Sequence, residues 1–313
     1  MGVQTLLLTG ASGFIGGAIL RRLRARADVA VRAASRQAPP GGTRLELNDP
    51  ATLPPALAGV DAVIHCAVGN AATTIAGTRH LLAAARAAGV RRFVHLSSVS
   101  VYAATEGALA EDSPRVTSEG AGYAHWKAAA ERECEAAGIE AVLLRPAIVH
   151  GAGSVLWVGK MGARLRNGLV GEMGAAGEGW CNPVHVDDVA AAAEAALTGR
   201  PGAYNISGAA PLTWNAYFAG LAAAMGIEPP RLTPARVARQ AWLSLPLKAL
   251  ARAAPALRPR LPALVEAPAR GELALFRQRV TYPIQAAAEG LGWRPSISVE
   301  QGWAEGAAWL RAA

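Results

Sequence analysis

The sequence predicts an α/β protein: a doubly wound parallel sheet with helices on both faces, followed by a smaller, mainly helical C-terminal lobe. Apolar runs of strand length alternate with helical patterns up to about residue 150, a glycine cluster follows the first run, and the alternation stops after Gly151. Continuous apolar strands separated by helices are typical of parallel sheets that are buried on both faces. Right-handed crossovers then give the doubly wound form.

Each expected strand of the first half is an apolar run bounded by turn residues. We expect strands at 3–9, 28–35, 43–48, 61–68, 91–99 and 139–147. Segments with helical spacing follow the first, fourth and fifth strands, at 14–26, 73–89 and 122–138. These elements make residues 1–150 the expected first domain.

The second half has a different pattern. Glycines and isolated tryptophans dominate 151–181. The segment 182–197 predicts a short strand and a helix capped by Asp187 or Asp188, and 202–208 predicts a further strand of the sheet. Residues 209–313 are helical and interrupted by prolines. We expect 151–181 and 209–313 to form the smaller lobe, with about 182–208 returning to the first domain.

Composition limits the class of protein. The 313 residues are 52% hydrophobic and 17% charged, which excludes a disordered chain. The net charge is +8, but the basic residues are scattered, so an anionic cofactor or substrate is favoured over nucleic acid. Three distant cysteines indicate neither a disulfide framework nor a zinc site. No signal-like segment and no apolar run of about 18 residues are present, so we expect a cytoplasmic protein without an integral membrane segment.

The glycine cluster follows the first strand directly. Gly10, Gly13 and Gly16 recur every third residue, and a helix is expected from Phe14. Backbone N–H groups and the dipole at that helix start favour a pyrophosphate over a merely tight turn.

The run "TGASGFIG" resembles the loop of the extended short-chain dehydrogenases/reductases, the NAD-dependent epimerase/dehydratase family. The resemblance implies a dinucleotide across a Rossmann-type sheet in 1–150 and a substrate-binding lobe beyond it. By this resemblance the cofactor residues are Gly10, Ser12, Gly13, Phe14, Ile15, Gly16, Glu46, Leu47, Cys66, Ala67, Val68, Ser97, Pro146 and Ile148, together with those of the next two paragraphs.

The end of the second strand bears on the choice of dinucleotide. An acidic residue there binds the ribose hydroxyls of NAD, whereas arginine accommodates the additional phosphate of NADP. This chain has Arg32, Ser35 and Arg36 in "VRAASR" and no carboxylate nearby. We therefore expect NADP(H) in preference to NAD(H), the alternative being two solvated arginines.

Tyr123 and Lys127 in "YAHWK" lie four residues apart on an expected helix and hence on one face. A nearby lysine cation would lower the pKa of the phenol towards the working range, and both side chains would also contact the cofactor. By resemblance, "LSSVSVY" provides the catalytic Ser98, whose hydroxyl would hold the substrate oxygen beside Tyr123. An asparagine of the family is replaced by Thr74, and Asn70 is the weak candidate for its role.

Three departures from the family bear on the substrate, and one is that "SSVSVY" lacks the Asp-Glu pair of the 4,6-dehydratases near the serine. Ile148, His150 and Cys181 stand where nucleotide-sugar enzymes often have asparagine, tyrosine and arginine. The expected pocket wall is apolar: Val155, Leu156, Trp157, Met161, Trp180 and Pro183. Substrate contacts are expected from Ser98, Val155, Trp157 and Trp180, and no metal site is expected because His150 and His185 stand without a ligand cluster.

These observations favour an NADP-dependent reductase or dehydrogenase of a carbonyl/hydroxyl pair in a partly apolar small molecule. The alternatives are a nucleotide-sugar epimerase or reductase and, less favoured, a non-catalytic NADP sensor. The family analogy also implies that a homodimer can form. The basic apolar segment 243–270 is interpreted as packed lobe helices, with a lid or a membrane-surface segment as alternatives.

Overall fold

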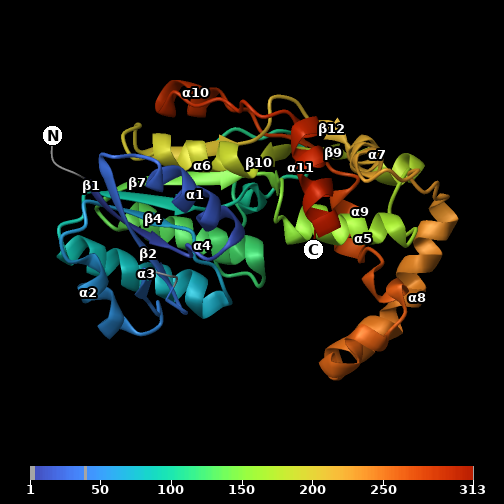
Figure 1. Cartoon of the computed structure of the whole chain (residues 1–313), viewed down its shortest axis with the longest axis horizontal. Coiled ribbons are helices and arrows are strands. Elements are labelled where there is room, and N and C mark those ends of the chain that lie inside the picture. The colour runs from blue at the N-terminus through green and yellow to red at the C-terminus, as the bar shows by residue number, and fades with distance from the viewer. Residues whose placement is uncertain (1–3, 39–40, 313) are drawn as a thin grey trace.

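The computed structural model describes residues 4–38 and 41–312, so Val3 of the expected first strand lies outside it. Its centre is a seven-stranded parallel sheet in the order β11-β7-β5-β4-β1-β2-β3 (Figure 1). The strands are β1 (Gln4–Thr9), β2 (Val29–Ser35), β3 (Thr43–Arg44), β4 (Ala62–His65), β5 (Arg92–Leu96), β7 (Glu140–Pro146) and β11 (Gly202–Ile206). The predicted doubly wound sheet is confirmed, and the strand order reverses beside β1, where such sheets bind ligands.

Three smaller sheets extend the structure. They pair β8 (Ile148–His150) with β10 (Pro183–His185), β9 (Trp180–Cys181) with β12 (Leu212–Thr213), and β6 (Glu106–Ala108) with β13 (Arg279–Thr281). The last of these pairings joins a loop of the first half to the C-terminal half of the chain.

Helices cover both faces of the large sheet. On one face, α1 (Phe14–Arg24), α6 (Val186–Ala195) and α10 (Gln285–Leu291) share a core with Leu6 and Leu8 of β1 (Figure 1). On the other, α2 (Leu53–Leu57), α3 (Ala71–Ala87) and α4 (Tyr123–Ala136) share a core with Leu7. Because successive side chains of a strand point to opposite faces, one leucine run supplies both cores.

The C-terminal lobe is mainly helical. It contains α5 (Met161–Arg166), α7 (Trp214–Ala224), α8 (Pro234–Ala253), α9 (Arg270–Leu275) and α11 (Val299–Ala312), with short helical turns at η3 (Val155–Lys160), η5 (Pro255–Arg260) and η6 (Ala263–Glu266). Trp214 is fully buried at the centre of its core, with its ring centroid 4.7 Å from that of Phe276. Aromatic packing of this kind contributes beyond the buried area. The division of the chain into two domains stays a prediction.

Two local expectations were wrong. The third strand is only Thr43–Arg44, because the chain leaves the sheet before 45–48. Neither Asp187 nor Asp188 caps α6: the cap is His185, whose side chain accepts a hydrogen bond from the Asp187 N–H. Asp188 is buried and accepts hydrogen bonds from the backbone of Ser296 and Ile297, which tie α6 to a segment more than 100 residues later.

No helix among residues 4–38 and 41–312 combines the length and the apolarity that crossing a membrane requires.

Candidate functional site

The glycine loop between β1 and α1 is closely packed. Gly10 has φ of +70°, and a Cβ there would lie 2.7 Å from the backbone nitrogen of Ala67. Gly13 is the N-cap of α1, and the helix begins at Phe14 as predicted. A Cβ on Gly16 would lie only 2.2 Å from the carbonyl oxygen of Gly10, so the helix can approach the loop only without a side chain at this position.

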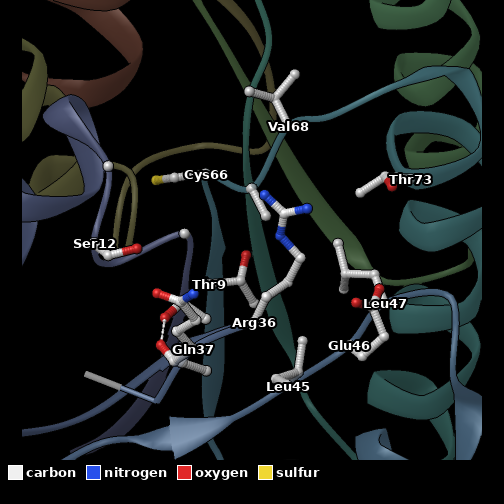
Figure 2. Close-up of a pocket in the computed structure, with 15 residues that line it drawn as sticks. Thr9, Ser12, Arg36, Gln37, Leu45, Glu46, Leu47, Cys66, Val68 and Thr73 are labelled. Carbon is white, nitrogen blue, oxygen red and sulfur yellow. Dashed lines mark hydrogen bonds between the residues drawn. The ribbon is translucent and has the colours of Figure 1, made fainter. Parts of the chain in front are cut away.

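A cavity of about 580 Å³, here called the glycine-loop pocket, lies at the carboxyl ends of β1, β2 and β4 (Figure 2). Ten of the expected cofactor residues line it: Gly10, Ser12, Gly13, Ser35, Arg36, Glu46, Leu47, Cys66, Ala67 and Val68. The sequence reasoning missed Thr9, Ala34, Gln37, Leu45 and Thr73, which also line it. Gly16 does not line the pocket, and its role in the structure is the close packing of α1.

Arg32 of β2 and Arg36 of the loop that follows it lie in different surroundings. Arg36 is exposed, and its side chain extends across the pocket towards the loop that carries Val68 (Figure 2). Arg32 does not line the pocket, because its guanidinium donates hydrogen bonds to the backbone carbonyls of Ala56 and Ala58 at the end of α2. The structure thus corrects the expectation that Arg32 lies at the pocket.

Two of the three expected proton-transfer residues, Ser98 and Tyr123, line one cavity, and the third, Lys127, lies behind it. Tyr123 is the first residue of the helix and, with Ser98, lines a second cavity. Lys127 lies one turn further on, 3% exposed, and its Nζ donates a hydrogen bond of 2.5 Å to the carbonyl oxygen of Leu96 at the end of β5. Lys127 lines neither pocket, so it lies beneath the site.

The pKa values of Tyr123 and Lys127 differ from the expectation. Burial raises the pKa of Tyr123 above its ordinary value, and the side chain of Ser98 opposes the rise. Lys127 does not contribute to this shift, so the expected lowering by the cation is not found. The ammonium is directed at the Leu96 carbonyl, and burial lowers the pKa of Lys127 itself to about 8.

The second cavity, here called the apolar pocket, has a volume of about 770 Å³. All four expected substrate residues line it: Ser98, Val155, Trp157 and Trp180. Phe14, Ile15, Ser97, Pro146 and Ile148, expected against the cofactor, also lie here. Gly13 lines the first pocket and Phe14 the second, so the two pockets adjoin at the start of α1.

The wall of the apolar pocket differs in part from the sequence expectation. Leu156 belongs to it, but Met161 and Pro183 do not, because both are buried in the packing behind the wall. Polar and aromatic groups that the sequence reasoning missed include Tyr102, Asn182, Trp214, Gln278 and Tyr282. No charged side chain lines this pocket in the part of the chain that the structure describes.

A buried ion pair contacts Tyr102, which lines the apolar pocket. Arg145 donates two hydrogen bonds to the carboxylate of Glu131, of 2.9 and 2.8 Å, and both side chains are almost completely buried. Arg145 also donates to the hydroxyl of Tyr102 at 3.0 Å, and that hydroxyl donates to Asn205 at 2.6 Å. These residues come from four separate segments, so no local spacing in the sequence could have indicated the network.

Two further sequence expectations concern polar residues near the site. Asn70, the candidate for the missing family asparagine, is the N-cap of α3, where its side chain accepts from the Thr73 N–H at 3.0 Å. Neither it nor Thr74 lines a pocket, so the structure does not support that role. His185 bonds Glu305 at 3.0 Å, and no three His, Cys, Asp or Glu side chains within the described ranges are grouped as metal ligands.

The site has the features that a dinucleotide requires. The glycine loop offers close backbone approach at a helix start, and the adjoining pocket places Ser98 and Tyr123 together. A nicotinamide nucleotide therefore fits the two pockets, with Gly10, Ser12, Gly13 and Arg36 available to hold its phosphates.

The comparisons with known proteins agree with this geometry. A model of the NAD-dependent epimerase/dehydratase family matches residues 6–207. The chain is 32% identical to 2-alkyl-3-oxoalkanoate reductase of Stenotrophomonas maltophilia (strain K279a), over 95% of this chain and 96% of that protein.

Solved structures share the fold over nearly the whole chain. UDP-glucuronic acid 4-epimerase from Bacillus cereus, solved with NAD, is 19% identical with a TM-score of 0.74, covering 98% of this chain and 96% of that one. RMD from Pseudomonas aeruginosa, solved with NADPH, is 21% identical with a TM-score of 0.68, covering 99% and 100%. The chain therefore belongs to the NAD-dependent epimerase/dehydratase family and is an NAD(P)-dependent enzyme of the extended short-chain dehydrogenase/reductase type.

Proposed function

We propose that this protein is an NADP-dependent reductase of a ketone carbonyl in a partly apolar small molecule. One observation carries the proposal: Ser98 and Tyr123 open into a large pocket without charged lining that adjoins the glycine loop. Burying unpaired charge is costly, so this lining disfavours a nucleotide diphosphate. It favours a ketone whose alkyl or aromatic portion fills the pocket and whose one charged group, where it has one, stays at the opening. The relative named 2-alkyl-3-oxoalkanoate reductase makes branched 3-oxo acids the first substrates to test.

The cofactor preference rests on Arg36. This cation follows β2 and extends into the glycine-loop pocket, where the additional phosphate of NADP would pair with it, and Ser35 lies beside it. No carboxylate follows β2 directly to receive the ribose hydroxyls of NAD. Glu46 also lines the pocket, but its carboxylate accepts a hydrogen bond from the Asn48 N–H of its own turn.

The proposed chemistry divides between the cofactor and three side chains. Bound NADPH would supply the hydride for the carbonyl carbon. Tyr123 would donate the proton to the carbonyl oxygen, because a phenol with an ordinary pKa of about 10 is protonated at neutral pH. With 46% of its surface exposed, Tyr123 can regain a proton from solvent after each turnover.

Ser98 and Lys127 have supporting roles in this proposal. The Ser98 hydroxyl donates a hydrogen bond to the same carbonyl oxygen and orients it towards Tyr123. Lys127 fixes the first turn of α4 to the end of β5 through the Leu96 carbonyl. The protein thus contributes orientation and a proton, and excludes much of the water through the apolar wall.

The test is NADPH oxidation with a panel of 2-alkyl-3-oxoalkanoates of increasing chain length. UDP-glucose and UDP-glucuronic acid form the competing class and are followed by product analysis, because an epimerisation consumes no NADPH. We expect turnover with the keto acids, and a loss of kcat on the order of 10²–10⁴-fold in Tyr123→Phe with unchanged NADPH binding. Full activity of Tyr123→Phe would refute the proton-transfer role. Conversion of the UDP-sugars alone would favour the epimerase alternative, and binding of NADPH without consumption across the panel would favour a sensor.

A further inference from the structure

Helix α8 has an apolar face that points away from the protein. Its inner side buries Val237 and Ser244 against the lobe, whereas Trp242, Leu243, Leu245 and Leu250 are exposed. Trp242 is 67% exposed and Leu245 is 49% exposed. A helix on a protein surface normally turns its polar face to water, so four large apolar side chains on the outer side of α8 depart from that pattern.

The same segment is strongly basic. From residue 229 to residue 265 the sequence has seven Lys and Arg residues and no Asp or Glu. Arg236, Arg239, Arg252 and Arg260 are exposed and form no salt bridge within residues 4–38 and 41–312. We call Pro234–Arg260, which comprises α8 and η5, the basic arm; it lies along the far edge of the C-terminal lobe (Figure 1).

We propose that the basic arm binds the surface of an anionic lipid bilayer, with Trp242 and the exposed leucines inserted at the headgroup level. Apolar side chains beside arginines on one outward face are the features that hold a helix in that interface. Each cation near an anionic surface adds to the attraction. Because the arm lies outside both pockets, this inference does not depend on the substrate.

A second copy of the chain fits this face poorly. In a two-fold dimer a surface patch packs near its own counterpart. The arm would then bring cations against cations with no carboxylate from 229–265 between them. An anionic bilayer, in contrast, neutralises the arginines and receives the apolar side chains together.

The experiment is co-sedimentation of the full chain with vesicles of equal parts phosphatidylcholine and phosphatidylglycerol, against vesicles of phosphatidylcholine alone. Two double variants test the two forces: Trp242→Gln with Leu245→Gln, and Arg239→Gln with Arg252→Gln. The matched control is Arg86→Gln with Arg91→Gln, which removes the same charge from exposed positions on α3 and before β5. Because all these side chains are exposed, we expect unchanged NADPH binding and thermal unfolding.

We expect binding to the phosphatidylglycerol vesicles, weakened about tenfold or more in each arm variant, reduced by added salt and nearly unchanged in the control. Absence of vesicle binding, or an equal loss in the control, would overturn the proposal. Self-association that disappears in the Trp242/Leu245 variant without vesicle binding would assign the face to a second copy. Binding of poly-L-glutamate but not of the vesicles would assign it to an acidic polypeptide.

Discussion

The buried ammonium of Lys127 donates a hydrogen bond of 2.5 Å to the backbone carbonyl of Leu96, and so joins the helix that begins with Tyr123 to the strand that leads to Ser98. This contact fixes two segments of the site relative to each other from below. It also places the ammonium in a buried position, where the loss of water disfavours the charged form. The effect of this burial on the free energy of unfolding can be measured.

Replacing this cation should increase stability at neutral pH. Burial lowers the pKa of Lys127 from 10.5 to about 8, a penalty of about 3 kcal/mol for the charged form. The lost hydrogen bond to Leu96 offsets about 1 kcal/mol. We expect Lys127→Met to raise the free energy of unfolding at pH 7 by about 2 kcal/mol, measured by urea denaturation.

The pH dependence gives the sign of this effect. Between pH 8 and 10.5 the unfolded chain holds the lysine proton and the folded chain has released it, so the stability contribution of Lys127 rises with pH. The advantage of Lys127→Met should therefore shrink across that range. An advantage that stays constant from pH 7 to pH 10 would show that the lysine is not the source.

Arg36 should determine the cofactor preference. The Arg36→Glu variant removes the cation proposed to pair with the additional phosphate and supplies a carboxylate for ribose hydroxyls. We expect NADPH affinity to fall by about tenfold or more and NADH affinity to rise, measured by fluorescence titration.

The control is Arg32→Gln, since Arg32 bonds the carbonyls of α2 and does not line the pocket. That variant should lose stability while the ratio of NADPH to NADH affinity is unchanged. A change of that ratio in Arg32→Gln alone would contradict the assignment.

Neighbouring glycines of α1 should respond in opposite directions. A Cβ on Gly16 would lie 2.2 Å from the Gly10 carbonyl, whereas at Gly17 the nearest atom is 3.8 Å away. We expect Gly16→Ala to lose about 1–3 kcal/mol of stability and to weaken cofactor binding. Gly17→Ala should gain about 0.5–1 kcal/mol from helix propensity. Equal thermal unfolding of the two variants would contradict the close packing.

The buried ion pair of Glu131 and Arg145 should be costly to break. Glu131 is completely buried, and its partner Arg145 is 1% exposed. The Glu131→Gln variant leaves the guanidinium without its counter-ion, so we expect a loss of about 3–5 kcal/mol. The control is Glu135→Gln on the same helix, an exposed partner of Arg115, which should cost at most about 0.5–1 kcal/mol. Similar denaturant midpoints for the two variants would show that the ion pair does not stabilise the fold.

Features encoded by neighbouring residues could be predicted from the sequence. The apolar runs gave the strands of the sheet, the glycine spacing gave the loop and the start of α1 at Phe14, and the four-residue interval put Tyr123 and Lys127 on one helix. Each depends on dihedral preferences or on a period within a dozen residues, so the chain carries the information locally.

Only the tertiary structure decided which of these side chains meet. Arg36 enters the pocket and Arg32 does not, because α2 presents its terminal carbonyls to one and not the other. Packing brings together four residues of separate segments, Glu131, Arg145, Tyr102 and Asn205. Packing also decides which side of α8 is buried against the lobe and which side is exposed. Such contacts join residues that are distant in the chain. The conformational preferences of neighbouring residues cannot specify a partner that lies on another helix or strand.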